Sequence, residues 1–209
     1  MSCRPEARRL QPGLRLVHAL LWFGLLGIVA PAARATPELV LLLRHGHKGG
    51  EAGNYNLSPQ GFDRAIALAA LLPRCFGSPN QIRTFYLDPV SSKNARSYQT
   101  AVPLAVATGV NISIDLASRE NSFASGRSIL TDPFLKGRRV LLFWEHRRLP
   151  ELAAGLSWPS MAPIDDDDDF DQLNVLRYRP AMPWPEVTRF SQSQLLAGQQ
   201  CCGPTPASP

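Results

Sequence analysis

The chain has 209 residues, a formal net charge of +5, and 44% hydrophobic and 19% charged residues. This composition excludes a disordered chain, and the lack of heptads, Gly-x-y triplets and internal repeats excludes fibrous and solenoid proteins. The length is sufficient for one domain with a substantial hydrophobic core.

The net positive charge is concentrated at the N-terminus. Residues 1–35 contain five arginines and one acidic residue, out of 22 basic and 17 acidic residues in the whole chain. The remaining residues therefore carry a net charge of only +1. They show no basic stripe interleaved with aromatic residues, so we expect no nucleic-acid partner despite a sequence pI near 9.3.

Residues 1–35 have the layout of a secretory signal peptide. An arginine-rich start precedes the uncharged run Ala19–Ala30, and the pattern Ala33-Arg34-Ala35 predicts cleavage before Thr36. A membrane anchor is the alternative, but the run has 12 residues, whereas about 20 are needed to cross a bilayer. We therefore predict a mature protein that is periplasmic or secreted and has no stable membrane anchor.

Strand-like and helix-like segments alternate along the mature chain. The patterns predict strands at 39–43, 82–87, 111–116, 139–145 and 173–178, and helices at 58–72, 95–107 and 150–156. This order predicts an α/β fold, a three-layer α/β/α sandwich with a mainly parallel central sheet, over residues 36–196. We expect residues 197–209 to be a disordered tail and the acidic run Asp165–Asp169 to be a solvated loop.

Three cysteines follow the predicted cleavage site. A disulfide between Cys75 and either Cys201 or Cys202 suits an oxidising compartment, and a buried free Cys75 is the alternative. No Cys-x-x-Cys or Cys/His spacing predicts a zinc site.

Two of the predicted strands end in polar residues suited to phosphate chemistry. Arg44-His45-Gly46 follows the first strand, and Glu145-His146 follows the strand at 139–145. An arginine offers a planar fork of donors to phosphoryl oxygens, and an imidazole can act as a nucleophile near neutral pH. Ligands of parallel α/β sheets bind beyond the carboxyl ends of the strands, so we expect the two polar ends to form one site.

With these residues the chain resembles the histidine phosphatase superfamily, the phosphoglycerate mutase-like fold. Four segments carry the resemblance in the right order: Arg44-His45-Gly46, Leu57–Ala65, the Ser92, Arg96 and Gln99-Thr100-Ala101 pattern, and Val140–His146. Together they extend over most of the mature chain.

The resemblance implies a role for each matching residue. His45 would attack phosphorus and form a phosphohistidine, and Arg44, Arg96 and His146 would surround the phosphoryl oxygens. Lys48 stands where acid phosphatases of the superfamily carry a basic residue, and would contact phosphate as a point charge. This cationic pocket implies no metal and no cofactor.

The proton donor for the leaving group is less well defined by the sequence. Glu120 is near the position of the glutamate in the mutase-like branch, although the leucine that normally precedes that glutamate by two positions is missing. The acid-phosphatase branch has an acid after the second histidine, where this chain has Arg147. Glu145 precedes His146, but neighbouring strand residues point to opposite faces. We rank Glu120 first, with Asp132 and Glu145 behind it.

The predicted function is that of an exported, metal-independent phosphatase that hydrolyses a small phosphomonoester through a phosphohistidine on His45. One alternative is a catalytically weak member of the same fold that binds phosphate or a phosphorylated glycan. The other is a phosphomutase, which would need a phosphorylated donor metabolite that an exported protein would rarely meet.

Overall fold

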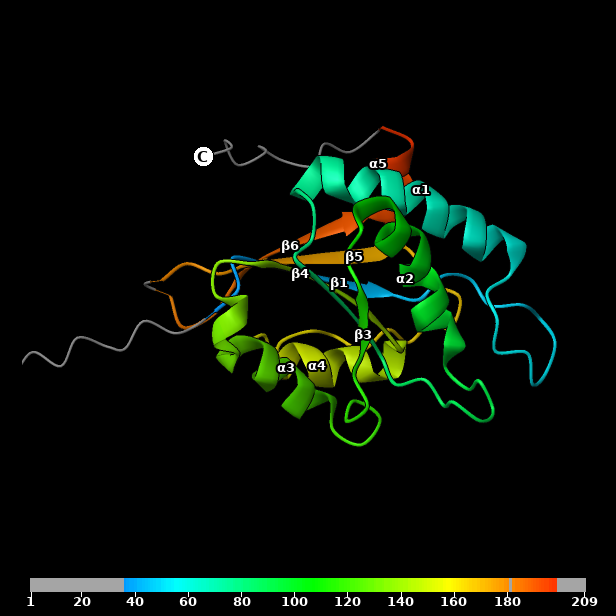
Figure 1. Cartoon of the computed structure of the whole chain (residues 1–209), viewed down its shortest axis with the longest axis horizontal. Helices are drawn as coiled ribbons and strands as arrows, with labels where there is room; N and C mark the ends of the chain where they lie inside the picture. Colours follow the sequence, from blue (N-terminus) through cyan, green and yellow to red (C-terminus); the bar gives the residue numbers. More distant parts are fainter. Residues whose placement is uncertain (1–35, 181, 199–209) are drawn as a thin grey trace, which may run out of the picture. The chain divides into compact units, whose positions relative to one another are not determined.

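A computed structural model describes residues 36–180 and 182–198 (Figure 1). In these residues the elements are β1 (Leu39–Arg44), α1 (Pro59–Phe76), β2 (Gln81–Thr84), α2 (Ala95–Thr108), β3 (Ile112–Ile114), α3 (Ser122–Thr131), β4 (Arg139–Trp144), α4 (Leu149–Gly155), β5 (Gln172–Arg177), β6 (Glu186–Ser191) and α5 (Gln192–Leu196). The predicted signal peptide, and the predicted tail beyond Gly198, lie outside the described residues. None of the described helices combines the length and apolar character needed to cross a membrane.

The six described strands form one mixed sheet in the order β3-β2-β4-β1-β5-β6. β1, β2, β3 and β4 pair in parallel, whereas β5 is antiparallel to β1 and β6 is antiparallel to β5. The sheet is therefore mainly parallel, as predicted, with an antiparallel edge. The sequence patterns missed β6 because few of its side chains are apolar and none is fully buried.

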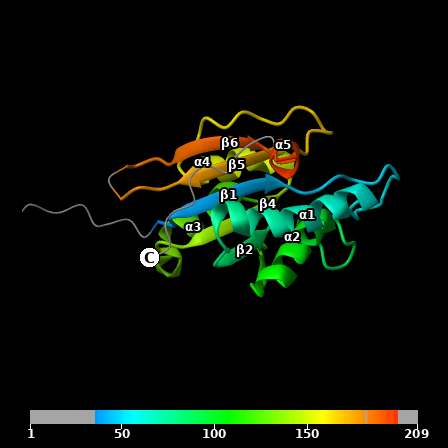
Figure 2. The ribbon, with the colours of Figure 1, turned by 90° about the horizontal axis from the view of Figure 1, so that it is seen from above.

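Helices cover both faces of the sheet, which confirms the predicted three-layer sandwich. Leu39, Leu41 and Leu43 of β1 pack with α1, α2 and α5 on one face, where α1 and α2 lie side by side (Figure 2). Val40 and Leu42 pack with α3 and α4 on the other face. The sequence patterns missed α3 because its first turns contain mainly small and polar residues.

Cys75 lies near the end of α1 and is 3% exposed. Its sulfur is in a disulfide. The candidate partners Cys201 and Cys202 lie outside the described residues.

The start of α1 is fixed by capping and by close packing on the loop that follows β1. Pro59 is the first helical residue, and the Ser58 hydroxyl accepts a hydrogen bond of 3.1 Å from the Gly61 N–H. A Cβ atom on Gly61 would lie 2.5 Å from the His47 carbonyl oxygen. Only glycine therefore lets α1 approach the residues that follow His45.

Candidate active site

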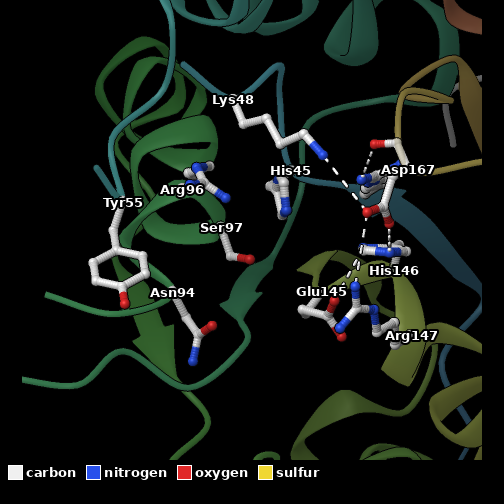
Figure 3. Close-up of a pocket in the computed structure, with 11 residues that line it drawn as sticks. His45, Lys48, Tyr55, Asn94, Arg96, Ser97, Glu145, His146, Arg147 and Asp167 are labelled. Atoms are coloured by element: carbon white, nitrogen blue, oxygen red, sulfur yellow. Dashed lines mark hydrogen bonds and ion pairs between the residues drawn. The ribbon is translucent and has the colours of Figure 1, made fainter. Parts of the chain in front are cut away.

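The two polar strand ends meet in the folded chain. Arg44 is paired with Trp144 in the parallel register of β1 and β4, and the His45 N–H donates to the Trp144 carbonyl at 3.2 Å. A cavity of about 190 Å³ opens beside them (Figure 3). Its walls are formed by Arg44, His45, Lys48, Tyr55, Asn94, Arg96, Ser97, Glu145, His146, Arg147 and Asp167.

His45 is held in the state that a nucleophile requires. Its side chain is buried, and Nδ1 lies 2.8 Å from the Gly46 carbonyl oxygen, which can only accept a hydrogen bond. Nδ1 therefore carries the proton, and Nε2 keeps its lone pair. Burial, together with the nearby positive charge of Arg44 and Arg96, lowers the pKa of His45 to about 3, so the imidazole is neutral at physiological pH.

Side chains of α2 form hydrogen bonds with the loop that follows His45, and α2 also forms part of the cavity wall. The Gly46 N–H donates to the Thr100 hydroxyl at 2.8 Å, and the Leu57 N–H donates to Gln99 Oε1 at 2.8 Å. The Gln-Thr pair of the sequence motif thus has a positioning role. Arg96 donates from Nε and Nη2 to two carbonyl groups of the same loop and also lines the cavity.

His146 lies between two carboxylates. Its Nε2 is 2.8 Å from Asp167 Oδ1, and its Nδ1 is 3.0 Å from Glu145 Oε1, without hydrogen-bond alignment in the second case. Burial and the charge of Arg44 lower the pKa of His146, although both carboxylates favour its protonated form. The His146 ring is therefore oriented toward Asp167, as Figure 3 shows.

Both Glu145 and His146 line the cavity, although adjacent strand residues point to opposite faces. The strand ends at Trp144, and a short 3₁₀ turn begins at His146. The change in backbone geometry between these elements brings both side chains to one side.

The Asp165–Asp169 segment, here called the acidic loop, is part of the site. The Arg44 guanidinium donates to three of its carbonyl oxygens, those of Asp167 at 2.6 Å, Asp169 at 2.7 Å and Asp166 at 3.2 Å. Asp165 to Asp168 are exposed, as expected of a solvated loop, but the backbone of the loop is held in place by Arg44. The sequence offered no signal for this contact, because more than 120 residues separate Arg44 from the loop.

Lys48 also faces the acidic loop. Its Nζ lies 3.7 Å from Asp167 Oδ2 and 3.7 Å from Asp168 Oδ1, and the side chain is 35% exposed. The lysine therefore reaches the cavity, where its present partners are carboxylates.

The structure does not bring two of the three candidate proton donors to the cavity. The Glu120 side chain is 83% exposed and lies 3.5 Å from Arg119. Asp132 caps a 3₁₀ turn and lies 3.6 Å from Arg83. Among the three, Glu145 alone lines the cavity, and Asp167 joins it there.

Besides Arg147 and Asp167, three polar residues of the wall were not predicted from the sequence. Ser97 is 1% exposed, and its hydroxyl has no hydrogen-bond partner among the described residues. Ser97 directly follows the predicted phosphate-binding residue Arg96, and this position in the sequence could have identified it as a candidate. Asn94 precedes α2, and Tyr55 lies in a loop without a recognisable pattern.

In the part of the chain that the structure describes, no group of three or more His, Cys, Asp or Glu side chains is arranged to hold a metal ion. His47, two residues after His45, belongs to no such group, and its ring packs against Phe170 with 4.5 Å between the ring centroids.

No family model matches the sequence, and no curated protein matches it. Solved structures do match the fold. The protein histidine phosphatase SixA, complexed with tungstate, is 13% identical and has a TM-score of 0.55, with 75% of this chain and 99% of that chain covered. Mycobacterial glucosyl-3-phosphoglycerate phosphatase is 17% identical with a TM-score of 0.48, and the match covers 74% of this chain and 97% of that chain. The chain therefore shares the fold of the protein histidine phosphatase SixA.

Proposed function

We propose that the protein is a phosphatase that hydrolyses a small phosphomonoester through a phosphohistidine on His45. The observation that carries this proposal is the buried, neutral His45, whose Nδ1 proton is fixed by Gly46. Its other nitrogen is available to a cavity lined by Arg44, Arg96 and Lys48. A nucleophile beside several cationic donors is the arrangement that phosphoryl transfer requires.

In the proposed reaction, His45 Nε2 attacks phosphorus while the bond from phosphorus to the leaving oxygen breaks. Arg96 and His146 are placed to stabilise the charge on the equatorial oxygens. Glu145 is our proposed proton donor to the leaving oxygen, acting from its protonated form, because it lines the cavity whereas Glu120 does not. Water, which gives a proton back to the Glu145 carboxylate, then attacks phosphorus. The phosphorus–nitrogen bond breaks, phosphate is released, and His45 Nε2 recovers its lone pair.

The direct test is rapid acid and base quenching of the purified protein during turnover of an aromatic phosphate. We expect one acid-labile, base-stable phosphoryl group on His45, and turnover that a chelator does not reduce. His45→Ala should abolish both the phosphoryl group and turnover. His47→Ala is the matched control, since His47 packs against Phe170 and is not a proposed catalytic group.

Turnover that survives in His45→Ala would contradict the proposal. An absence of turnover, with inorganic phosphate still raising the melting temperature, would favour the phosphate-binding alternative.

A further inference from the structure

The Asp167 carboxylate is surrounded by donors that suit a phosphoryl group. One oxygen lies 2.8 Å from His146 Nε2. The other lies 3.7 Å from both Lys48 Nζ and Arg147 Nη2. All four residues line the same cavity as His45 (Figure 3). The carboxylate therefore occupies the positively charged and hydrogen-bonding groups that would otherwise contact the phosphoryl oxygens of a substrate.

The acidic loop is folded so that Asp167 reaches these donors. Arg44 holds its backbone through three carbonyl groups, and the Asp166 carboxylate accepts a hydrogen bond of 2.8 Å from the Asp168 N–H. The Asp168 side chain stays 81% exposed, against 54% for Asp167. The contact with His146 is thus specific to one of five adjacent aspartates.

Asp167 is ionised at neutral pH in this arrangement. The hydrogen bond from His146 and the charge of Lys48 lower the pKa of Asp167. An ionised carboxylate has no proton to give to a leaving group. Its negative charge does, however, compete with another anion for the same donors.

We propose that Asp167 is an internal competing anion, which occupies part of the phosphoryl subsite until a phosphoryl dianion displaces it. This inference rests on the phosphatase or phosphate-binding function of the same cavity. A dianion brings more charge to the donors than the single carboxylate that it replaces, whereas a singly charged phosphodiester brings no more. Displacement of Asp167 therefore lowers the affinity for singly charged ligands more than that for doubly charged ones, which favours phosphomonoesters.

The test is the affinity for tungstate, a non-reacting oxyanion, measured by calorimetry on the purified protein. Asp167→Asn keeps the shape of the side chain and removes its charge, so we expect tungstate to bind about 10-fold more tightly. Asp165→Asn makes the same change in net charge on an exposed residue of the acidic loop that does not line the cavity, and we expect a change of less than about 3-fold. Asp167→Ala should change the affinity in the same direction as Asp167→Asn, since the effect depends on charge.

A second ligand tests this preference. Dimethyl phosphate, which carries one negative charge, should bind measurably to Asp167→Asn and much more weakly to the original protein. Unchanged or weaker tungstate binding in Asp167→Asn would overturn the inference. So would a loss of turnover at unchanged tungstate affinity, which would identify Asp167 as a proton donor instead.

The binding measurement separates this inference from the proposed function. If tungstate binds to none of the proteins, the anion site itself is wrong and both proposals fail. If tungstate binds equally to all of them, only the role of Asp167 fails. If binding tightens in Asp167→Asn but no protein turns over an aromatic phosphate, the competing anion stands and the phosphatase function fails.

Discussion

Ser97 carries a buried hydroxyl that the protein itself leaves without a hydrogen-bond partner among the described residues. Such a group costs about 1–3 kcal/mol of folding free energy when it is unsatisfied. Ser97 lies in the first turn of α2, on the cavity wall. We therefore expect its hydroxyl to bond to a phosphoryl oxygen, and to lower the stability of the unliganded protein.

Ser97→Ala should separate these two effects. We expect the dissociation constant of phosphate to rise by about 10-fold, while the free energy of unfolding stays unchanged or increases by about 1 kcal/mol. Calorimetry and urea unfolding measure the two quantities. Ser125→Ala is the opposite control, because the Ser125 hydroxyl donates to the Asn121 carbonyl at 3.3 Å, away from the cavity. A loss of stability in Ser97→Ala with unchanged phosphate binding would show a purely structural hydroxyl.

His45 should make stability depend on pH in the acid range. Its pKa is about 3 in the folded protein, against 6.5 ordinarily, so the unfolded chain binds a proton that the folded chain does not. The stabilisation is present above pH 6.5 and is lost as the pH falls towards 3. Urea unfolding between about pH 4 and 7.5 should show a slope that His45→Asn reduces by up to about 1.4 kcal/mol per pH unit. Equal slopes for both proteins would contradict a buried, neutral His45.

At the scale of elements, α1 continues beyond the proline at which we predicted its end. Pro73 lies inside the helix, which ends only at Phe76. Cys75 and Phe76 are almost fully buried in the last turn, and the Gly77 N–H donates to the Pro73 carbonyl at 3.0 Å. Tertiary burial therefore outweighs the local preference of proline to end a helix.

The first turn of α1 offers a test of how an element positions the site. In Gly61→Ala, the new methyl group would approach the His47 backbone to 2.5 Å. We expect a loss of about 1–3 kcal/mol in unfolding free energy, and a fall in kcat/KM because the loop after His45 must shift. Gly50→Ala is the control, since its Cβ meets nothing within 4 Å. Similar behaviour of the two variants would show that the loop is more adaptable than its packing indicates.

At the scale of the whole molecule, we propose that the chain is exported and cleaved before Thr36. Cleavage there would keep the hydrogen bond of 3.0 Å from the Gly137 N–H to the Thr36 carbonyl within the mature chain. Mass spectrometry of the protein recovered from a bacterial periplasm should give a chain that starts at Thr36. Ala35→Lys should block cleavage at that site. Recovery of the uncleaved chain from the cytoplasm would contradict export.

The sequence by itself determined the sheet core, the two histidines and Arg44. Arg96, which lies in α2, was assigned only through the resemblance to the histidine phosphatase superfamily. These features are encoded locally, since a buried strand reads as a continuous apolar run and its polar end follows directly. The parallel order of the strands then places such ends at one edge. The amino-acid sequence was therefore sufficient to assign His45 and His146 to one site.

Only the tertiary structure decided which carboxylates reach the cavity. Glu120 follows a strand at a plausible spacing, yet its side chain points to solvent. Asp167 is one of five adjacent aspartates, and nothing in that run distinguishes it. Its place beside His146 depends on the path of the acidic loop. Arg44, which is 123 residues away from Asp167 in the sequence, stabilises that path by hydrogen bonds. Such contacts arise from the closure of the whole fold, so local sequence patterns do not encode them.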